Sequence, residues 1–212
     1  MSEVVVAGFL EAAHEAGAVI SSPRVGAAWD SPSALAEMTV GAVAGHLLLV
    51  VRRVGLHLRE EEPLVQDSRP PGTFTWLRVG EAEDLGRAEH RAVRADGDRV
   101  AQWGWEAVRT GYAERVEEVA DRLHPPCPRS VRVGDTVMDF EFYLVTRIIE
   151  LLVHADDVAV SAGLPAGEPP AGAVSLALPV LVDAARSIHG DLAVVRSLSR
   201  RERAEGPEPS VF

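Results

Sequence analysis

The sequence has a single cysteine, no excess of basic residues and no apolar run long enough to span a bilayer. Cys127 lies in PPCPR, so neither a disulfide framework nor a cysteine-rich metal site can form within the chain, and we expect a loop residue without a catalytic role. The formal net charge is -11, and the arginines are scattered among acids. Such a chain lacks the basic surface that binds a phosphate backbone, so we expect no nucleic-acid partner.

The N-terminal segment also lacks the basic region of a signal peptide, and Glu11 and Glu15 interrupt its apolar residues. The longest apolar run elsewhere, Val40 to Val51, is too short to cross a membrane and contains His46. We therefore expect a cytoplasmic protein with no membrane partner. The length of 212 residues and the apolar content of 47% predict one globular domain, over residues 1–203, followed by a flexible tail at 204–212.

Apolar residues recur at helical spacing through most of the chain. The predicted helical regions are 2–19, 23–29, 40–58, 81–123, 139–163, 171–187 and 191–199. We expect Thr39 to cap the third of these, and a break near 96–98 or at Gly104 to divide the fourth. The valines on either side of Gly134 and Asp135 predict a small hairpin. Together these features predict an all-α protein, an up-and-down four-helix bundle with additional short helices.

Residues 59–80 are acidic and then rich in proline and glycine, which predicts a long surface loop. Long loops within compact domains tend to be functional. Phe74 and Trp76 are therefore candidates for the mouth of a site.

A polar stripe runs along the otherwise apolar helix at 139–163. It consists of Tyr143, Arg147, Glu150, His154 and Asp157, at steps of four, three, four and three. Residues at these steps share one face of a helix. Burial of Glu, Arg and Asp is costly unless each is paired or bound to a metal, so the stripe indicates a site.

Glu150 and His154 stand four residues apart, the spacing by which one helix offers two ligands to a divalent ion. His46 is a histidine inside an apolar helical stripe and is the candidate third ligand. Two histidines and one carboxylate suit a zinc site with an open fourth position, although the same ligands also describe ferrous iron, and nickel or manganese could bind.

The remaining stripe residues have open roles. Arg147 could bind a carboxylate of a substrate or thiol cofactor, or it could neutralise Glu150 or Asp157, and we favour the pairing. Asp157 could accept the second N–H of His154 or cap a neighbouring helix. Tyr143 is expected at the pocket wall, where its hydroxyl could donate to a ligand.

Two segments resemble a known family. The segments are AAWDSPSAL with MTVGAVAGHLL, and TRIIELLVHADDVAVSAGLP. They resemble the metal-binding domain of mycothiol-dependent maleylpyruvate isomerase, which belongs to the DinB-like helical superfamily. The resemblance covers residues 2–203 and places the family's ligands on His46, Glu150 and His154. The isomerase has a further C-terminal domain that contributes to its active site, so the resemblance extends to the bundle only.

The resemblance implies zinc, with mycothiol or another low-molecular-weight thiol as cosubstrate. We therefore expect a thiol-dependent transferase or isomerase acting on a small electrophile. A metal-dependent hydrolase is the first alternative, with Asp157, Tyr143 or Glu61 as general base. A bundle that binds metal or a small ligand without turnover is the second. We expect a monomer or a weak homodimer formed through an outer helix.

Overall fold

The computed structural model describes residues 1–59, 88–134, 136–165 and 167–199, and only the backbone of 88–90. In this part of the chain it contains eight helices and one two-stranded sheet, which confirms the all-α class. The elements are α1 (Glu3–Ile20), α2 (Pro23–Ala27), α3 (Val40–His57), α5 (Ala88–Ala101), α6 (Trp105–Ala120), β1 (Ser130–Val133), β2 (Thr136–Asp139), α7 (Phe140–Ser161), α8 (Ala171–His189) and α9 (Asp191–Ser199). The predicted loop with Glu61, Phe74 and Trp76, the turn residue Asp135 and the tail 204–212 lie outside the described residues.

Local sequence determines where the helices that carry the stripe and His46 begin. Thr39 Oγ1 accepts a hydrogen bond from Ala42 N at 3.1 Å, which is the predicted cap of α3. Asp139 Oδ1 accepts from Phe142 N at 3.0 Å and caps α7 in the same way. Gly104, with φ 84°, separates α5 from α6 at one of the two predicted break points.

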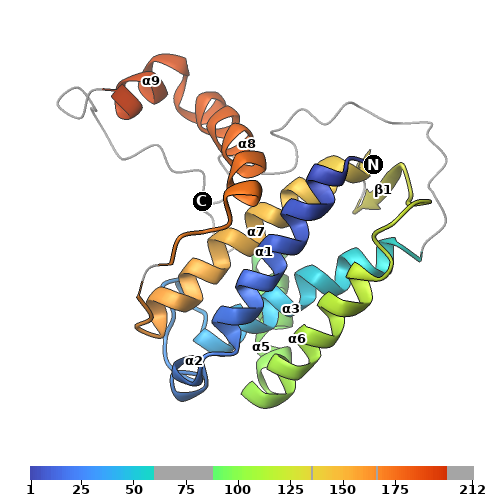
Figure 1. The fold of residues 1–212 in the computed structure, drawn as a ribbon. Helices are drawn as coiled ribbons and strands as arrows, with labels where there is room; N and C mark the ends of the chain where they lie inside the picture. Colours follow the sequence, from blue (N-terminus) through green and yellow to red (C-terminus); the bar gives the residue numbers. More distant parts are fainter. Residues whose placement is uncertain (60–87, 135, 166, 200–212) are drawn as a thin grey trace.

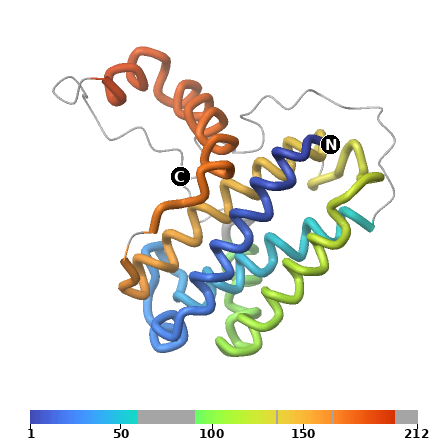
Figure 2. Tube along the Cα trace, in the orientation of Figure 1, coloured from blue at the N-terminus to red at the C-terminus, as the bar shows by residue number. Residues whose placement is uncertain are grey.

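Four long helices, α1, α3, α6 and α7, form the bundle (Figure 1). The first and last of these run in the same direction. At their starts, Ser2 N donates to Glu141 Oε1 at 2.5 Å, and beyond their ends Arg24 Nη1 donates to the carbonyl oxygen of Gly163 at 2.6 Å. Figure 2 shows the two traces side by side over their length.

The other two helices run against this pair. Ala34 N, just before α3, donates to Ser161 Oγ at the end of α7 at 2.8 Å, so α3 and α7 are antiparallel. Trp105, the first residue of α6, donates through Nε1 to the carbonyl oxygen of Ile20 at the end of α1 at 2.8 Å, and the Tyr112 hydroxyl donates to that of Ala13 at 3.0 Å, so α6 runs against α1. α1 and α7 therefore run in one direction, and α3 and α6 run in the other. The four helices do not alternate in direction along the sequence, because α5 carries the chain back between α3 and α6.

The core lies between these four helices. The apolar residues that recur at helical spacing in α1 and α3 are buried, and Leu58, just after α3, is half-buried; the buried ones are Val5, Phe9, Ala12, Ala13, Ala16, Val43, Leu47, Val50 and Val54. α7 is buried on more than one face because it packs against both α1 and α3. This placement explains why its sequence is apolar almost throughout.

α5 crosses α3 at a contact between two glycines. A Cβ atom on Gly45 would lie 2.9 Å from the carbonyl oxygen of Gly97, and a Cβ on Gly97 would lie 2.6 Å from that of Ala42. Real Cβ atoms essentially never come this close to backbone oxygen. The two helices can therefore reach this separation only with glycine at both positions.

β1 and β2 form the predicted hairpin, paired antiparallel with Val131 opposite Met138. The hairpin leads directly into α7, and the amide of Phe140 donates to the carbonyl oxygen of Arg129 at 3.0 Å. Val131 and Met138 are both buried against the core. The start of α7 is thus held in place by the sheet.

α8 and α9 project from the bundle (Figure 1). α8 packs on α1 and α7, whereas α9 packs on α8. α3 and α8 are the two described helices that are long and apolar enough to cross a membrane. Of their apolar segments, 72% is buried within the molecule in α3 and 22% in α8. One or two such helices are a weak indication of a membrane span, since core helices pass the same test.

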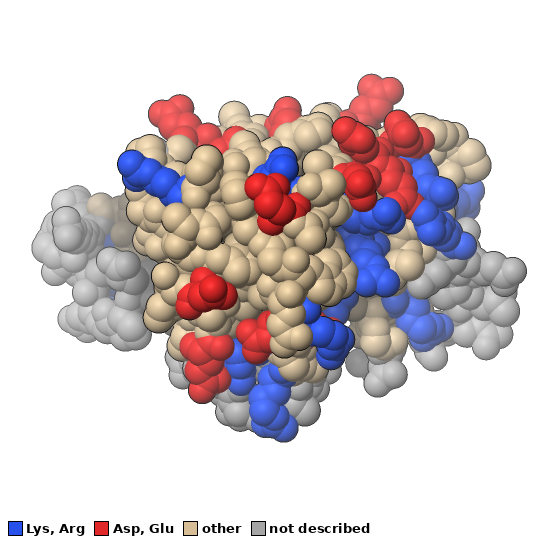
Figure 3. Space-filling view, turned by 90° about the horizontal axis from the view of Figure 1, so that it is seen from below, with Lys and Arg blue, Asp and Glu red and all other residues tan. Residues whose placement is uncertain are grey.

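Charged side chains of both signs share the surface. Figure 3 shows arginine and acidic side chains next to one another, with the largest basic group at the right of that view. Some of these pairs form within a helix: Arg109 Nη2 lies 2.7 Å from Glu106 Oε2, and Arg99 Nη1 lies 3.0 Å from Asp96 Oδ1.

Candidate metal centre

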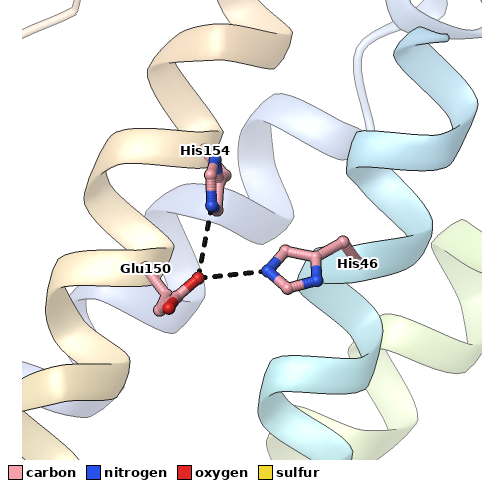
Figure 4. A group of neighbouring side chains, drawn as sticks. All are labelled: His46, Glu150 and His154. Atoms are coloured by element: carbon pink, nitrogen blue, oxygen red, sulfur yellow. Dashed lines mark hydrogen bonds and ion pairs between the residues drawn. The ribbon is translucent and has the colours of Figure 1, made fainter. Parts of the chain in front are cut away.

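The predicted ligands come from two antiparallel helices of the bundle. His46 lies on the inward face of α3 and is 8% exposed. Glu150 and His154 lie one turn apart on the face of α7 that packs against α3. Figure 4 shows the three side chains meeting between α3 and α7, with both histidine rings directed at the carboxylate of Glu150. The structure thus brings together three residues that the spacing on α7 and the apolar stripe of α3 singled out separately.

The three side chains meet at one oxygen atom. His46 Nε2 lies 3.1 Å and His154 Nε2 lies 3.2 Å from Oε2 of Glu150 (Figure 4). The two imidazole rings meet edge to face, with centroids 5.0 Å apart. All three donor atoms lie within 4.8 Å of one another, so this candidate metal cluster could hold a metal ion.

Burial and neighbouring charges set the protonation of the cluster. Burial lowers the pKa of His46 below its ordinary value of 6.5, against the effect of its contact with Glu150. Burial alone would raise the pKa of Glu150, but its hydrogen bonds with His154 and His46 and the charge of Arg147 hold that pKa well below the ordinary value. Glu150 is therefore a carboxylate and His46 a neutral imidazole near neutral pH, the forms that bind metals.

Asp157 holds the other side of the His154 ring. Its Oδ2 lies 2.9 Å from His154 Nδ1, which leaves Nε2 directed at Glu150. A carboxylate on the far nitrogen orients a ligand histidine and increases its basicity. Although burial lowers the pKa of His154, the hydrogen bonds to Asp157 and Glu150 raise it to about 9. This is the contact that we considered for Asp157, and a capping contact is not needed to explain its position.

Arg147 is buried beside the cluster. Its Nη2 lies 3.8 Å from Glu150 Oε1, the oxygen that the histidines leave open, in agreement with the pairing we favoured. Its guanidinium carbon lies 5.1 Å from the ring centroid of Tyr143. Tyr143 and Arg147 also line one pocket of about 380 Å³, so Tyr143 is at a pocket wall as expected.

Thr146 is a positioning residue that sequence reasoning missed. It is fully buried, its Oγ1 donates to the carbonyl oxygen of Tyr143 at 2.6 Å, and it accepts from Arg147 Nε at 3.2 Å. In the sequence, the only indication of this role is that Thr146 carries a hydroxyl next to Arg147 in an otherwise apolar helix. The ring of His57, the last residue of α3, meets that of Tyr143 edge to face, with ring centroids 5.0 Å apart.

The donor set fits a small divalent ion. Ligands about 2.0–2.1 Å from a tetrahedral zinc ion lie about 3.4 Å apart. The two histidine-to-carboxylate distances, 3.1 and 3.2 Å, come within a few tenths of this value. The same contacts serve as hydrogen bonds in the metal-free protein. Two of the three pairs of donor atoms thus already have nearly the spacing of metal ligands, and all three atoms lie within 4.8 Å of one another.

Comparison with protein-family models, with curated proteins and with solved structures finds no match for this chain. The geometry and the chemistry of the residues therefore carry the functional argument.

Proposed function

We propose that His46, Glu150 and His154 bind one divalent metal ion, and that the chain is a cytoplasmic enzyme dependent on a low-molecular-weight thiol. Zinc is the first choice of metal, and nickel, ferrous iron or manganese would use the same ligands. The enzyme would transfer the thiol to a small electrophile or isomerise it. The observation that carries the metal site is the meeting of two imidazole nitrogens at one oxygen of Glu150, 3.1 and 3.2 Å away.

The thiol follows from the chemistry of such a site. A zinc ion held by three protein ligands would keep one coordination position open, and a thiol bound at that position would have its pKa lowered enough to be a thiolate near neutral pH. The nucleophile would then be available without a separate general base. The resemblance of the two ligand-bearing segments to the isomerase family supports mycothiol as this thiol.

The residues around the cluster have separate tasks in this proposal. Asp157, 2.9 Å from His154 Nδ1, keeps the Nε2 lone pair of that ring directed at the metal position. Arg147, 3.8 Å from Glu150 Oε1, keeps this carboxylate ionised and presents cationic N–H groups beside it. Tyr143 packs against that guanidinium and forms part of the wall of the adjacent pocket.

The test is an assay of thiol consumption with the metal-loaded full chain, mycothiol and a panel of small electrophiles. We expect consumption of thiol, or an isomerised double bond, only when metal and thiol are both present. Glu150→Gln should lose both bound metal and activity, because an amide oxygen is a weaker ligand than a carboxylate. Glu114→Gln, on the exposed surface of α6, removes the same charge and should leave both intact.

Three other results would redirect the assignment. Rates equal to those of metal-free protein across the panel would contradict the thiol-dependent reaction. Metal-dependent cleavage of ester or amide substrates without thiol would identify a hydrolase. Tight metal binding with neither reaction would leave a bundle that binds metal without turnover.

A further inference from the structure

A basic pocket lies beside the candidate metal cluster, where the end of α3, the hairpin and the start of α7 meet. It has a volume of about 380 Å³ and is lined by Arg53, Leu56, His57, Arg132, Val133, Gly134, Tyr143 and Arg147. Of the eight described residues that line it, three are arginines, one is a histidine and none is an acid. In a chain with a formal net charge of -11, this concentration of positive charge in one hollow is unusual and needs an explanation.

The deep end of the basic pocket adjoins the cluster through Arg147. That side chain is 7% exposed, and its guanidinium lies between the Tyr143 ring and Glu150 Oε1. A ligand that contacts Arg147 is therefore separated from Glu150 only by the Arg147 side chain. Arg147 thus lines the basic pocket and also contacts the candidate metal cluster, where Glu150 partly balances its charge.

Two further cations stand nearer the solvent. Arg53 lies four residues before His57, so the two share a face of α3, and its side chain is 46% exposed. Its Nη2 lies 4.0 Å from Asp96 Oδ2, at the limit of an ion pair. Arg132 is exposed on β1, between the buried Val131 and the half-buried Val133. These two guanidinium groups carry two permanent positive charges on different elements of the pocket wall.

We propose that the basic pocket binds a small organic dianion, a dicarboxylate or a phosphate monoester, through Arg53 and Arg132. Guanidinium groups bind carboxylate and phosphate oxygens in pairs of parallel hydrogen bonds. Two such groups on different elements match two negative charges, and the volume corresponds to roughly a dozen water molecules. To call this dianion the substrate rests on the proposed function, whereas its binding does not require the metal.

The experiment measures binding of three probes to the full chain by titration calorimetry at physiological salt. Succinate and inorganic phosphate are the dianionic probes, and succinamide is the neutral counterpart of succinate. Each is titrated into the metal-free and the metal-loaded protein. We expect succinate or phosphate to bind to both forms and succinamide to bind to neither. The tighter of the two anions shows whether the pocket prefers a dicarboxylate or a phosphate group.

The variants assign the binding to the two arginines. Arg53→Gln and Arg132→Gln should each weaken the preferred dianion at least tenfold, because each removes a charge-assisted pair of hydrogen bonds. Arg196→Gln, on the exposed surface of α9, makes the same change in net charge and should bind like the wild type. Arg53 and Arg132 are both exposed, so circular dichroism should show that the two variants remain folded.

The two proposals fail separately. Equal affinities in the wild type and both pocket variants, equal binding of succinamide, or no anion binding at millimolar concentration would overturn the basic pocket as a dianion site. Binding only to the metal-loaded protein, unaffected by the arginine variants, would assign the anion to the metal and overturn it too. Anion binding that depends on both arginines, without any thiol reaction, would leave the pocket standing and contradict the proposed function.

Discussion

Glu150 Oε2 has two alternative roles at one position, as acceptor for two histidines or as ligand to a metal. In the metal-free protein the hydrogen bonds to Asp157 and Glu150 outweigh the effect of burial and raise the pKa of His154 to about 9, so this ring carries a proton at neutral pH. That proton stabilises the fold fully below about 6.5, the ordinary value, and the contribution is lost as the pH rises through about 9. A metal that binds His154 must displace the same proton.

Metal binding at pH 7 should therefore release about one proton from His154, and the release should vanish as the pH rises above about 9. His46 adds none, because its lowered pKa leaves it neutral at pH 7. Calorimetry in buffers of different ionisation enthalpy measures the release. Asp157→Asn removes the carboxylate that lies 2.9 Å from His154 and supports its raised pKa, so this variant should release fewer protons on metal binding. Equal proton release in the wild type and this variant would contradict the assignment.

Residue spacing predicted the cluster but not its surroundings. Glu150 and His154 share a face of any helix that contains both, and His46 stands in an apolar stripe, so the three could be selected without coordinates. Arg53 and Arg132 could not be paired from the sequence, because they are 79 positions apart and α5, α6 and part of β1 lie between them. The basic pocket exists only because the hairpin packs beside the end of α3.

At the scale of elements, local signals predicted where helices begin and end. Thr39 and Asp139 each cap a helix, α3 and α7, by accepting from the backbone amide three residues later, and Gly104 supplies a positive φ between α5 and α6. Helix direction and crossing depend on contacts between distant segments. The parallel course of α1 and α7, and the approach of Gly45 to Gly97, therefore required the structure.

The crossing of α3 and α5 gives a prediction on stability. Gly97→Ala should destabilise the fold by about 1–3 kcal/mol, since its Cβ would lie 2.6 Å from the carbonyl oxygen of Ala42 and the helices must move apart. Gly111→Ala is the matched control on α6, where a Cβ meets only the Leu48 side chain at 3.4 Å. There alanine should stabilise by up to about 1 kcal/mol through helix propensity. Urea unfolding measures both, and equal effects would contradict the tight crossing.

At the scale of the whole molecule, the candidate metal cluster joins two helices from different parts of the chain. His46 on α3 and the pair on α7 lie 104 positions apart at their closest. Between them lie α5, α6 and the hairpin, so an ion bound by all three would tie the early and late halves of the bundle together. The outer helices α8 and α9 expose Leu178, Leu192 and Leu198, and the monomer or weak homodimer stays a prediction that light scattering would test.

Metal loading should therefore raise the melting temperature of the whole bundle. An ion that binds only the folded chain stabilises it by about 2.7 kcal/mol at a free concentration one hundred times its dissociation constant. His46→Ala removes the only ligand on α3 and should abolish most of this gain, whereas His14→Ala, exposed on α1, should retain it. Thermal unfolding with zinc and after chelation, combined with elemental analysis, measures both effects. Stoichiometric metal of unchanged affinity in His46→Ala would show that α3 supplies no ligand, since the ion would then depend on α7 alone.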